Sequence, residues 1–161
     1  MNNLFAQRII LGGQSAGAQL ASLLAYERQA TQTKSSLFSG LRSVSGSLDF
    51  AFCQSGRIGK RLAAYIGHLP NPEIADPVAF ADPRIPIFVL CLHGKNDPVV
   101  DPQNSRAFAN KLNQGAIQRA HLHILAHTYY SDVLNLFFEP FKQTHLLTDW
   151  LTDIDQQPLA A

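Results

Sequence analysis

Near the start of the chain, an apolar run leads directly into a serine flanked by small residues, and this junction constrains the fold most. The run is Arg8-Ile9-Ile10-Leu11-Gly12, and the serine lies in Gly13-Gln14-Ser15-Ala16-Gly17. Residues 16–28 are rich in alanine and leucine, which favour a helix. A strand, a tight turn and a helix form the context of a nucleophile elbow, where strand and helix approach closely. The sequence therefore predicts that Gly13 and Gly17 supply the room for Ser15 on such a turn.

Short β-rich runs alternate with helical patterns along the rest of the chain, which is typical of a mostly parallel sheet covered on both faces. Strands are predicted at 8–13, 41–45, 85–93 and 121–126. Helices are predicted at about 16–30, 55–66, 103–113 and 133–150, the last broken near Pro140. Residues 69–86 hold five prolines, so we interpret them as an irregular excursion over the sheet edge. The fold class is therefore α/β, a three-layer sandwich in one domain over residues 1–161.

Composition and charge exclude several classes of function. The 161 residues are 46% hydrophobic, which suits one globular core, and 13 basic against 12 acidic residues give a net charge of +1. This balance provides no electrostatic footprint for nucleic acid or an anionic membrane, and we interpret Arg57, Lys60 and Arg61 as a solvated helix face. No apolar stretch is long enough to span a bilayer, and no signal peptide is visible. We therefore expect a cytoplasmic protein without nucleic-acid or membrane partners.

The two cysteines, Cys53 and Cys91, fit neither a disulfide framework nor a metal-binding spacing. Cys91 lies in the predicted strand 85–93, and we interpret it as an inert buried thiol. We expect neither a metal nor an organic cofactor.

A serine hydroxyl becomes a nucleophile only with a base to take its proton and an acid to orient that base. In a parallel sheet, both are expected at the carboxyl ends of later strands. The third predicted strand ends in His93-Gly94-Lys95-Asn96-Asp97-Pro98, which makes Asp97 the candidate acid. The alternative interpretation is that Asp97 only caps a turn. The nearby Asp101 precedes Pro102 and has the position of a helix cap.

The base is expected in the loop after the fourth strand, residues 126–132, where His127 is the only histidine. The other histidines have simpler interpretations. His121 and His123 share one face of the predicted strand, and His93 is expected to shape the turn beside Gly94. His145 lies in the final predicted helix, and His68 lies in a loop without a motif.

Together these motifs resemble the α/β-hydrolase fold superfamily, and within it the carboxylesterase and lipase group related to hormone-sensitive lipase and arylformamidase. Residues 8–21 look like the family's elbow strand and helix, 43–49 like the segment that ends its next strand, and 93–100 like its acid turn. The resemblance implies the C-terminal half of that fold, with about four strands. It also implies that Ser15 is the nucleophile, Asp97 the triad acid, and the backbone amide of Ala16 one oxyanion-hole donor.

The chain departs from the family pattern in two ways. The family histidine commonly stands two residues before a stretch such as Asp132-Val133-Leu134, where this chain has Tyr130. Tyrosine, with a pKa of about 10, is not a base near pH 7, so His127 takes the role if the loop is effectively three residues shorter. The upstream strands and the His-Gly-Gly loop, which supplies the second oxyanion amide in the family, do not occur in these residues.

These observations predict a serine hydrolase that acts on carboxylic esters through Ser15, Asp97 and a histidine. Two other functions stay open: a catalytically inactive remnant that acts as an interaction module, and a peptidase of the same fold. Without upstream strands, the first strand becomes a bare apolar edge that needs a cover. The expected partners are therefore a small ester substrate and, along that edge, a second copy of the chain or a separate chain that supplies the missing half.

Overall fold

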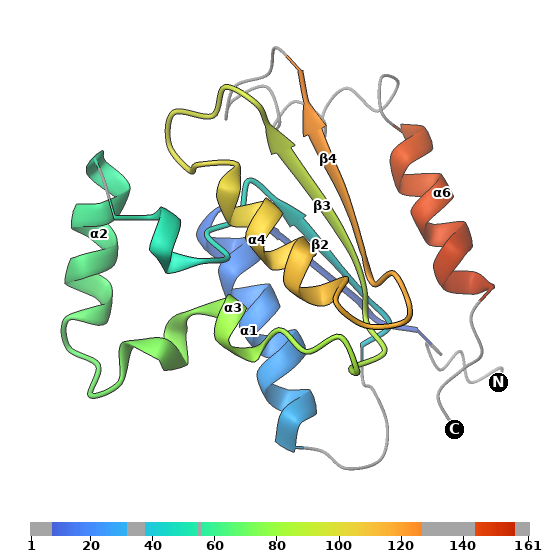
Figure 1. The fold of residues 1–161 in the computed structure, drawn as a ribbon, viewed down its shortest axis with the longest axis horizontal. Helices are drawn as coiled ribbons and strands as arrows, with labels where there is room; N and C mark the ends of the chain where they lie inside the picture. The colour runs from blue at the N-terminus through green and yellow to red at the C-terminus, as the bar shows by residue number, and fades with distance from the viewer. Residues whose placement is uncertain (1–7, 32–37, 55, 127–143, 157–161) are drawn as a thin grey trace, which may run out of the picture.

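A computed structural model describes residues 8–31, 38–54, 56–126 and 144–156 (Figure 1). Four parallel strands form one sheet in the order β1-β2-β3-β4, and their bounds are β1 (Ile10–Gln14), β2 (Gly40–Val44), β3 (Phe88–Gly94) and β4 (Ala120–Leu125). The strands pair in register at Gly13 with Ser43, and at Ser43 with Cys91. The carboxyl ends of all four strands therefore lie at one edge of the sheet, as Figure 1 shows.

Helices cover both faces of the sheet and make the three layers that the sequence predicts. The helices α1 (Ala16–Thr31) and α4 (Gln103–Leu112) pack on one face, together with the short α3 (Pro77–Phe80). The helix α6 (Thr144–Asp155) packs on the other face. The helix α2 (Gly56–Ile66) stands apart from the sheet, beyond the 3-10 helices η1 (Phe50–Phe52) and η2 (Pro72–Ala75) (Figure 1).

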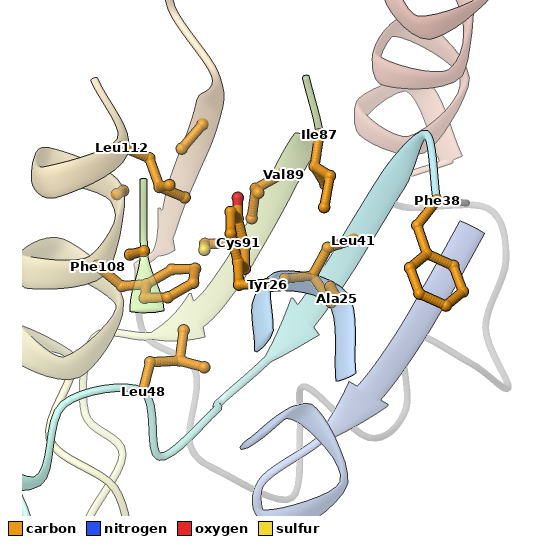
Figure 2. Packing of buried hydrophobic residues seen from close by; sticks show 13 residues of the cluster. Ala25, Tyr26, Phe38, Leu41, Leu48, Ile87, Val89, Cys91, Phe108 and Leu112 are labelled. Atoms are coloured by element: carbon orange, nitrogen blue, oxygen red, sulfur yellow. The ribbon is translucent and has the colours of Figure 1, made fainter. Parts of the chain in front are cut away.

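The central strand β3 divides the hydrophobic core between the two faces. All seven of its residues are buried, and their side chains alternate, as the period of two in a strand requires. Val89 and Cys91 join the cluster under α1 and α4, where the Tyr26 and Phe108 rings meet edge to face at 5.8 Å (Figure 2). The opposite face packs on α6, with a cluster of Val44, Phe88, Leu90, Leu92, Trp150 and Ile154.

The excursion over residues 69–86 differs from its prediction. It contains η2 and α3, and α3 packs against α1 and α4 on the face of the sheet opposite to α6. Its prolines permit this because Pro72 and Pro77 lie in the first turns of the two short helices, where the missing amide costs no hydrogen bond. The prediction of an irregular path over the sheet edge was therefore wrong. Residues 133–143 of the last predicted helix lie outside the described ranges.

Both cysteines are buried, as predicted for Cys91. Burial raises the pKa of the Cys91 thiol to about 12, which keeps it protonated near neutral pH. Burial also raises the pKa of Cys53. Cys91 is thus a packing residue of the core.

The histidines of β4, His121 and His123, lie on the face of the sheet that packs against α6. His121 lies 3.8 Å from the Asp153 carboxylate, while burial and the neighbouring His121 and His145 lower the pKa of His123. The unfolded chain therefore binds a proton at His123 more readily than the folded chain does. The free energy of unfolding is unaffected by His123 above the ordinary histidine pKa of about 6.5. It decreases as the pH falls from that value through the lower pKa that His123 has in the folded chain.

We therefore expect His123→Gln to reduce the acid sensitivity of the fold. Thermal melting at pH 7.5 and 5.5 should show a smaller drop in Tm for this variant than for the parent chain. The matched control is His68→Gln, because His68 is exposed and lies outside the sheet. Equal drops in Tm for His123→Gln and the parent would contradict the role of His123.

None of the helices within the described ranges is both long and apolar enough to cross a membrane.

Candidate active site

Ser15 occupies a strained turn at the carboxyl end of β1. Its φ is 52°, in the left-handed region that residues other than glycine rarely adopt. The Ser15 N–H donates to the Val44 carbonyl at 2.9 Å, and the Ser15 carbonyl accepts from the amides of Ala18 and Gln19 at 3.1 Å. These bonds attach the turn to β2 and begin α1. The predicted strand, tight turn and helix around Ser15 are confirmed.

The two elbow glycines have different steric surroundings. A Cβ at Gly13 would lie 2.3 Å from the backbone carbon and oxygen of Gly17 and 2.6 Å from the Ala18 nitrogen. A Cβ at Gly17 would meet no atom of the described residues within 4 Å. The expected need for a small residue therefore holds at Gly13 and was wrong for Gly17 in this chain. Between them, the buried Gln14 Nε2 has no hydrogen-bond partner among the described residues.

Asp97 is held rigidly in the turn after β3. Its Oδ1 accepts from the backbone amides of Val99 at 2.8 Å and Val100 at 3.0 Å, and its side chain is fully buried. Its other oxygen, Oδ2, lies 3.4 Å from His93 Nε2 and has no hydrogen-bond partner within the described part of the chain. One carboxylate oxygen is thus fixed by the backbone, and the second is available to another side chain.

The environment of Asp97 favours its charged form. Burial alone would raise the pKa of Asp97, but His93, the amides of Val100 and Val99, and the Ser45 hydroxyl together lower it below the ordinary value. Asp101, the alternative acid, is exposed and accepts from the Gln103 amide at 2.8 Å. Its expected role as a cap at the start of α4 is confirmed.

His93 shapes the acid turn, as expected from its place beside Gly94. Its ring is fully buried, with Nε2 at 2.9 Å from the Val100 carbonyl and Nδ1 at 2.8 Å from Ser105 Oγ. A carbonyl only accepts, so we assign the proton to Nε2 and let the Ser105 hydroxyl donate to Nδ1. Both ring nitrogens are therefore used in holding the turn.

Ser45 is a residue that the sequence analysis missed. It is fully buried, has a φ of 44°, and donates its N–H to the Leu92 carbonyl at 2.9 Å. Its hydroxyl contributes to the low pKa of Asp97. The signal that could have found it is position, because Ser45 directly follows β2 in the way that Ser15 directly follows β1.

A pocket of about 260 Å³ opens beside Ser15, between α1 and α2. Its wall is mostly apolar, and Gln19 stabilises it by donating to the Ala75 carbonyl at 2.9 Å. The pocket, which we call the serine pocket, is lined by Ser15, Ala16, Gln19, Leu20, Ser47, Cys53, Ile58, Arg61, Leu62 and Tyr65. A mostly apolar cavity with Ser15 at its wall suits a small acyl or alcohol group.

A second hollow of about 760 Å³ lies over the acid turn, and we call it the acid-turn hollow. It shares Ile58 and Arg61 with the serine pocket. Its walls come from α2 and from the loop after β3, and they are formed by Phe52, Arg57, Ile58, Arg61, Lys95, Asn96, Asp97, Pro98, Val99, Asp101 and Pro102. The structure therefore brings Ser15 and Asp97 to adjoining cavities at the carboxyl edge of the sheet.

The candidate base is not placed by the structure. His127 and Tyr130 both lie outside the described residues. The chain leaves β4 beside the acid turn, since Lys95 donates its N–H to the Leu125 carbonyl at 2.9 Å. Within the described ranges, no group of three or more His, Cys, Asp or Glu residues could hold a metal ion.

Asn104 connects α4 to the loop beneath the serine pocket. It is fully buried, and its Oδ1 accepts from the amides of Leu48 at 3.1 Å and Asp49 at 3.0 Å. Its Nδ2 donates to the Asp101 carbonyl at 3.0 Å. One side chain thus satisfies the backbone of two loops at the site.

We expect Asn104→Ala to lower the free energy of unfolding by about 2–4 kcal/mol, because it leaves the buried Leu48 amide and the partly buried Asp49 amide without this acceptor. Urea unfolding measures this loss. The control is Asn110→Ala, an exposed position on the same helix, which should change stability by less than about 0.5 kcal/mol. Similar losses for the two variants would contradict a special role for Asn104.

Solved structures show which proteins share this fold. A structure described as a truncated form of a carbohydrate esterase from gut microbiota superimposes with a TM-score of 0.74 at 18% identity, over 96% of this chain and 62% of that one. An acetyl ester-xyloside bifunctional hydrolase from Caldicellulosiruptor lactoaceticus gives a TM-score of 0.72 at 22% identity, over 95% of this chain and 59% of that one. The chain therefore spans about three fifths of the length of these two proteins.

A peptidase also shares the fold. The puromycin-hydrolyzing peptidase of Mycobacterium tuberculosis matches with a TM-score of 0.61 at 26% identity, over 81% of this chain and 20% of that one. No curated protein matches the chain. The family model BD-FAE matches residues 2–112, which is more than half of the chain. The chain therefore belongs to the BD-FAE family and has the α/β-hydrolase fold.

Proposed function

We propose that this chain is a serine hydrolase domain that cleaves carboxylic esters by acyl transfer. The observation that carries the proposal is the left-handed Ser15, held at the start of α1 and facing a small apolar pocket. Strain of this kind persists only where the surrounding structure holds it, and it is concentrated at functional sites. Membership of the BD-FAE family and the fold shared with esterases support the same reading.

In the proposed mechanism, Ser15 Oγ attacks the ester carbonyl carbon while a histidine accepts the hydroxyl proton. That proton then passes to the leaving alcohol, and water releases the acyl group as a carboxylic acid. The Ala16 amide is the proposed oxyanion donor, because the first amides of a helix have no acceptor within it and carry its positive end. No metal or organic cofactor takes part.

Asp97 is proposed to orient the histidine and to stabilise its protonated form. A carboxylate with a lowered pKa stays charged near neutral pH, and Oδ2 is the oxygen that remains for an imidazole N–H. His127 is the proposed base, since it follows β4 by two residues and β4 ends beside the acid turn.

Intact-mass measurement after treatment with a fluorophosphonate tests the nucleophile. We expect one adduct on the parent chain and none on Ser15→Ala. The matched control is Ser47→Ala, because Ser47 lines the same pocket as Ser15 and should leave the adduct intact. A folded parent chain that forms no adduct would contradict the proposal that Ser15 is a nucleophile and would favour a catalytically inactive remnant.

A peptidase is the second candidate function, and the likeness to the puromycin-hydrolyzing peptidase favours it. Esters and amides pass through the same acyl-enzyme, so the fold does not separate the two activities. We would compare the turnover of p-nitrophenyl acetate with that of p-nitroacetanilide. The two substrates share the acetyl group and differ in the leaving group, which is a phenol in the ester and an aniline in the amide. A preference for the anilide would favour the peptidase.

The edge of β1 is proposed to pair with a second copy of this chain. Within the described residues, β1 pairs only with β2, and Ile10 in β1 and Ile9 just before it are 39% and 38% exposed. An apolar strand edge without a partner is a template for pairing with another strand, and a two-fold contact is the commonest way for a second copy to supply that strand. Sedimentation velocity should give a dimer for the parent chain and a monomer for Ile10→Lys. A parent chain that stays monomeric would exclude the second copy as the cover.

A further inference from the structure

Three cations gather at the entrance to the proposed active site. Arg57 and Arg61 lie one turn apart on α2, and Lys95 follows β3 on the other side of the acid-turn hollow. The arginines are exposed on α2, as the sequence analysis expects of a solvated helix face, and the structure adds that both line the wall of this hollow. Lys60, the third member of that cluster, lines neither cavity.

All three cations are exposed, and none of them takes part in an ion pair between described residues. Two carboxylates share the hollow with them. Asp97 Oδ1 accepts from the Val99 and Val100 amides, and Asp101 accepts from the Gln103 amide. The three cations of the hollow exceed its two carboxylates by one, so a net positive charge is left for an anionic group that enters from outside.

Arg61 places part of this positive charge beside Ser15, because it belongs to the walls of both cavities. It lines both the serine pocket, which contains Ser15, and the acid-turn hollow, which contains Arg57 and Lys95. A guanidinium matches a carboxylate with two parallel hydrogen bonds, and a second arginine one turn away reinforces the field at the same place. A substrate held at Ser15 would thus extend a short anionic arm past Arg61.

We propose that the substrate carries a carboxylate, a few atoms from the scissile ester, that binds Arg61 and Arg57 with Lys95 nearby. The inference rests on the proposed esterase function and narrows its substrate class to anionic esters. The carboxylate can belong to the acyl part, as in a monoester of a dicarboxylic acid, or to the alcohol part.

Matched substrates test the charge preference on both sides of the ester. Mono-p-nitrophenyl glutarate is compared with p-nitrophenyl hexanoate for the acyl side, and 4-acetoxybenzoate with 4-acetoxybenzamide for the alcohol side. In at least one pair, kcat/KM should favour the anion by about 10-fold, and added salt should reduce the preference. Arg61→Gln and Arg57→Gln should each bring the ratio of kcat/KM for the anionic ester to kcat/KM for the neutral ester down to about one. Lys60→Gln is the matched control and should retain it.

Binding provides a measurement that does not depend on turnover. Calorimetric titration with monomethyl glutarate should show binding to the parent chain and to Lys60→Gln, and none to Arg61→Gln. Dimethyl glutarate, which lacks the charge, should bind all three chains equally weakly. One outcome would overturn the anionic subsite but keep the esterase function. In it, Ser15 is labelled and neutral esters are cleaved, but kcat/KM shows no preference for the anionic esters and monomethyl glutarate does not bind. If Ser15 is not labelled but monomethyl glutarate binds through Arg61, the esterase function fails and the anion site stands.

Discussion

Asp97→Asn is expected to lower kcat for a simple ester by about 10³–10⁴-fold while the chain stays folded. The turn should survive because an asparagine Oδ1 can accept from the Val99 and Val100 amides as the aspartate does. The side chain loses its charge, however, and a neutral amide does not stabilise a protonated imidazole. Steady-state hydrolysis of p-nitrophenyl acetate measures the loss, and the circular dichroism spectrum confirms that the fold is kept.

Asp101→Asn is the matched control for this prediction. Asp101 follows Asp97 by four residues in the same loop, but it is exposed and caps α4 through the Gln103 amide. Its variant should keep kcat within about 2-fold, since an asparagine caps a helix as well as an aspartate. Equal losses in the two variants would indicate a general disturbance of the loop and would contradict a specific role for Asp97.

The sheet and its main helices could be predicted from the sequence because their signals are local. The continuous apolar run of β3 matches its complete burial, and the glycine-flanked Ser15 matches its left-handed turn. The position of Asp97 also follows from a general property of the fold, since the ends of parallel strands meet at one edge. Residue type and strand order carried these predictions.

Other features depend on which distant parts of the chain lie next to a residue in the folded structure, and local sequence patterns do not predict these contacts. The arginines of α2 have the spacing of one helix face, but only the structure shows that this face lines a cavity. The residue type of Ser45 does not predict its φ of 44°, and only its position directly after β2 sets it apart. The proline-rich segment failed for a similar reason, since Pro72 and Pro77 can either prevent a helix or begin one.

The two elbow glycines also differ in contacts that the sequence does not predict. This difference leads to the largest expected change in the free energy of unfolding. Gly13 and Gly17 look equivalent in sequence, yet a Cβ at Gly13 would lie 2.3 Å from backbone atoms of Gly17. Backbone atoms cannot rotate away, so α1 would have to move off β1. We expect Gly13→Ala to lower the free energy of unfolding by about 3 kcal/mol or more, and to reduce fluorophosphonate labelling of Ser15.

Gly17→Ala should act in the opposite direction. Among the residues that the structure describes, no atom would lie within 4 Å of its Cβ, and the position lies in the first turn of α1. Alanine is favoured over glycine in a helix, so this variant should gain up to about 1 kcal/mol. Urea unfolding of both variants measures the contrast. A similar loss in the two would mean that the elbow needs both small residues, as the sequence alone suggests, and that another surface packs on α1 at Gly17.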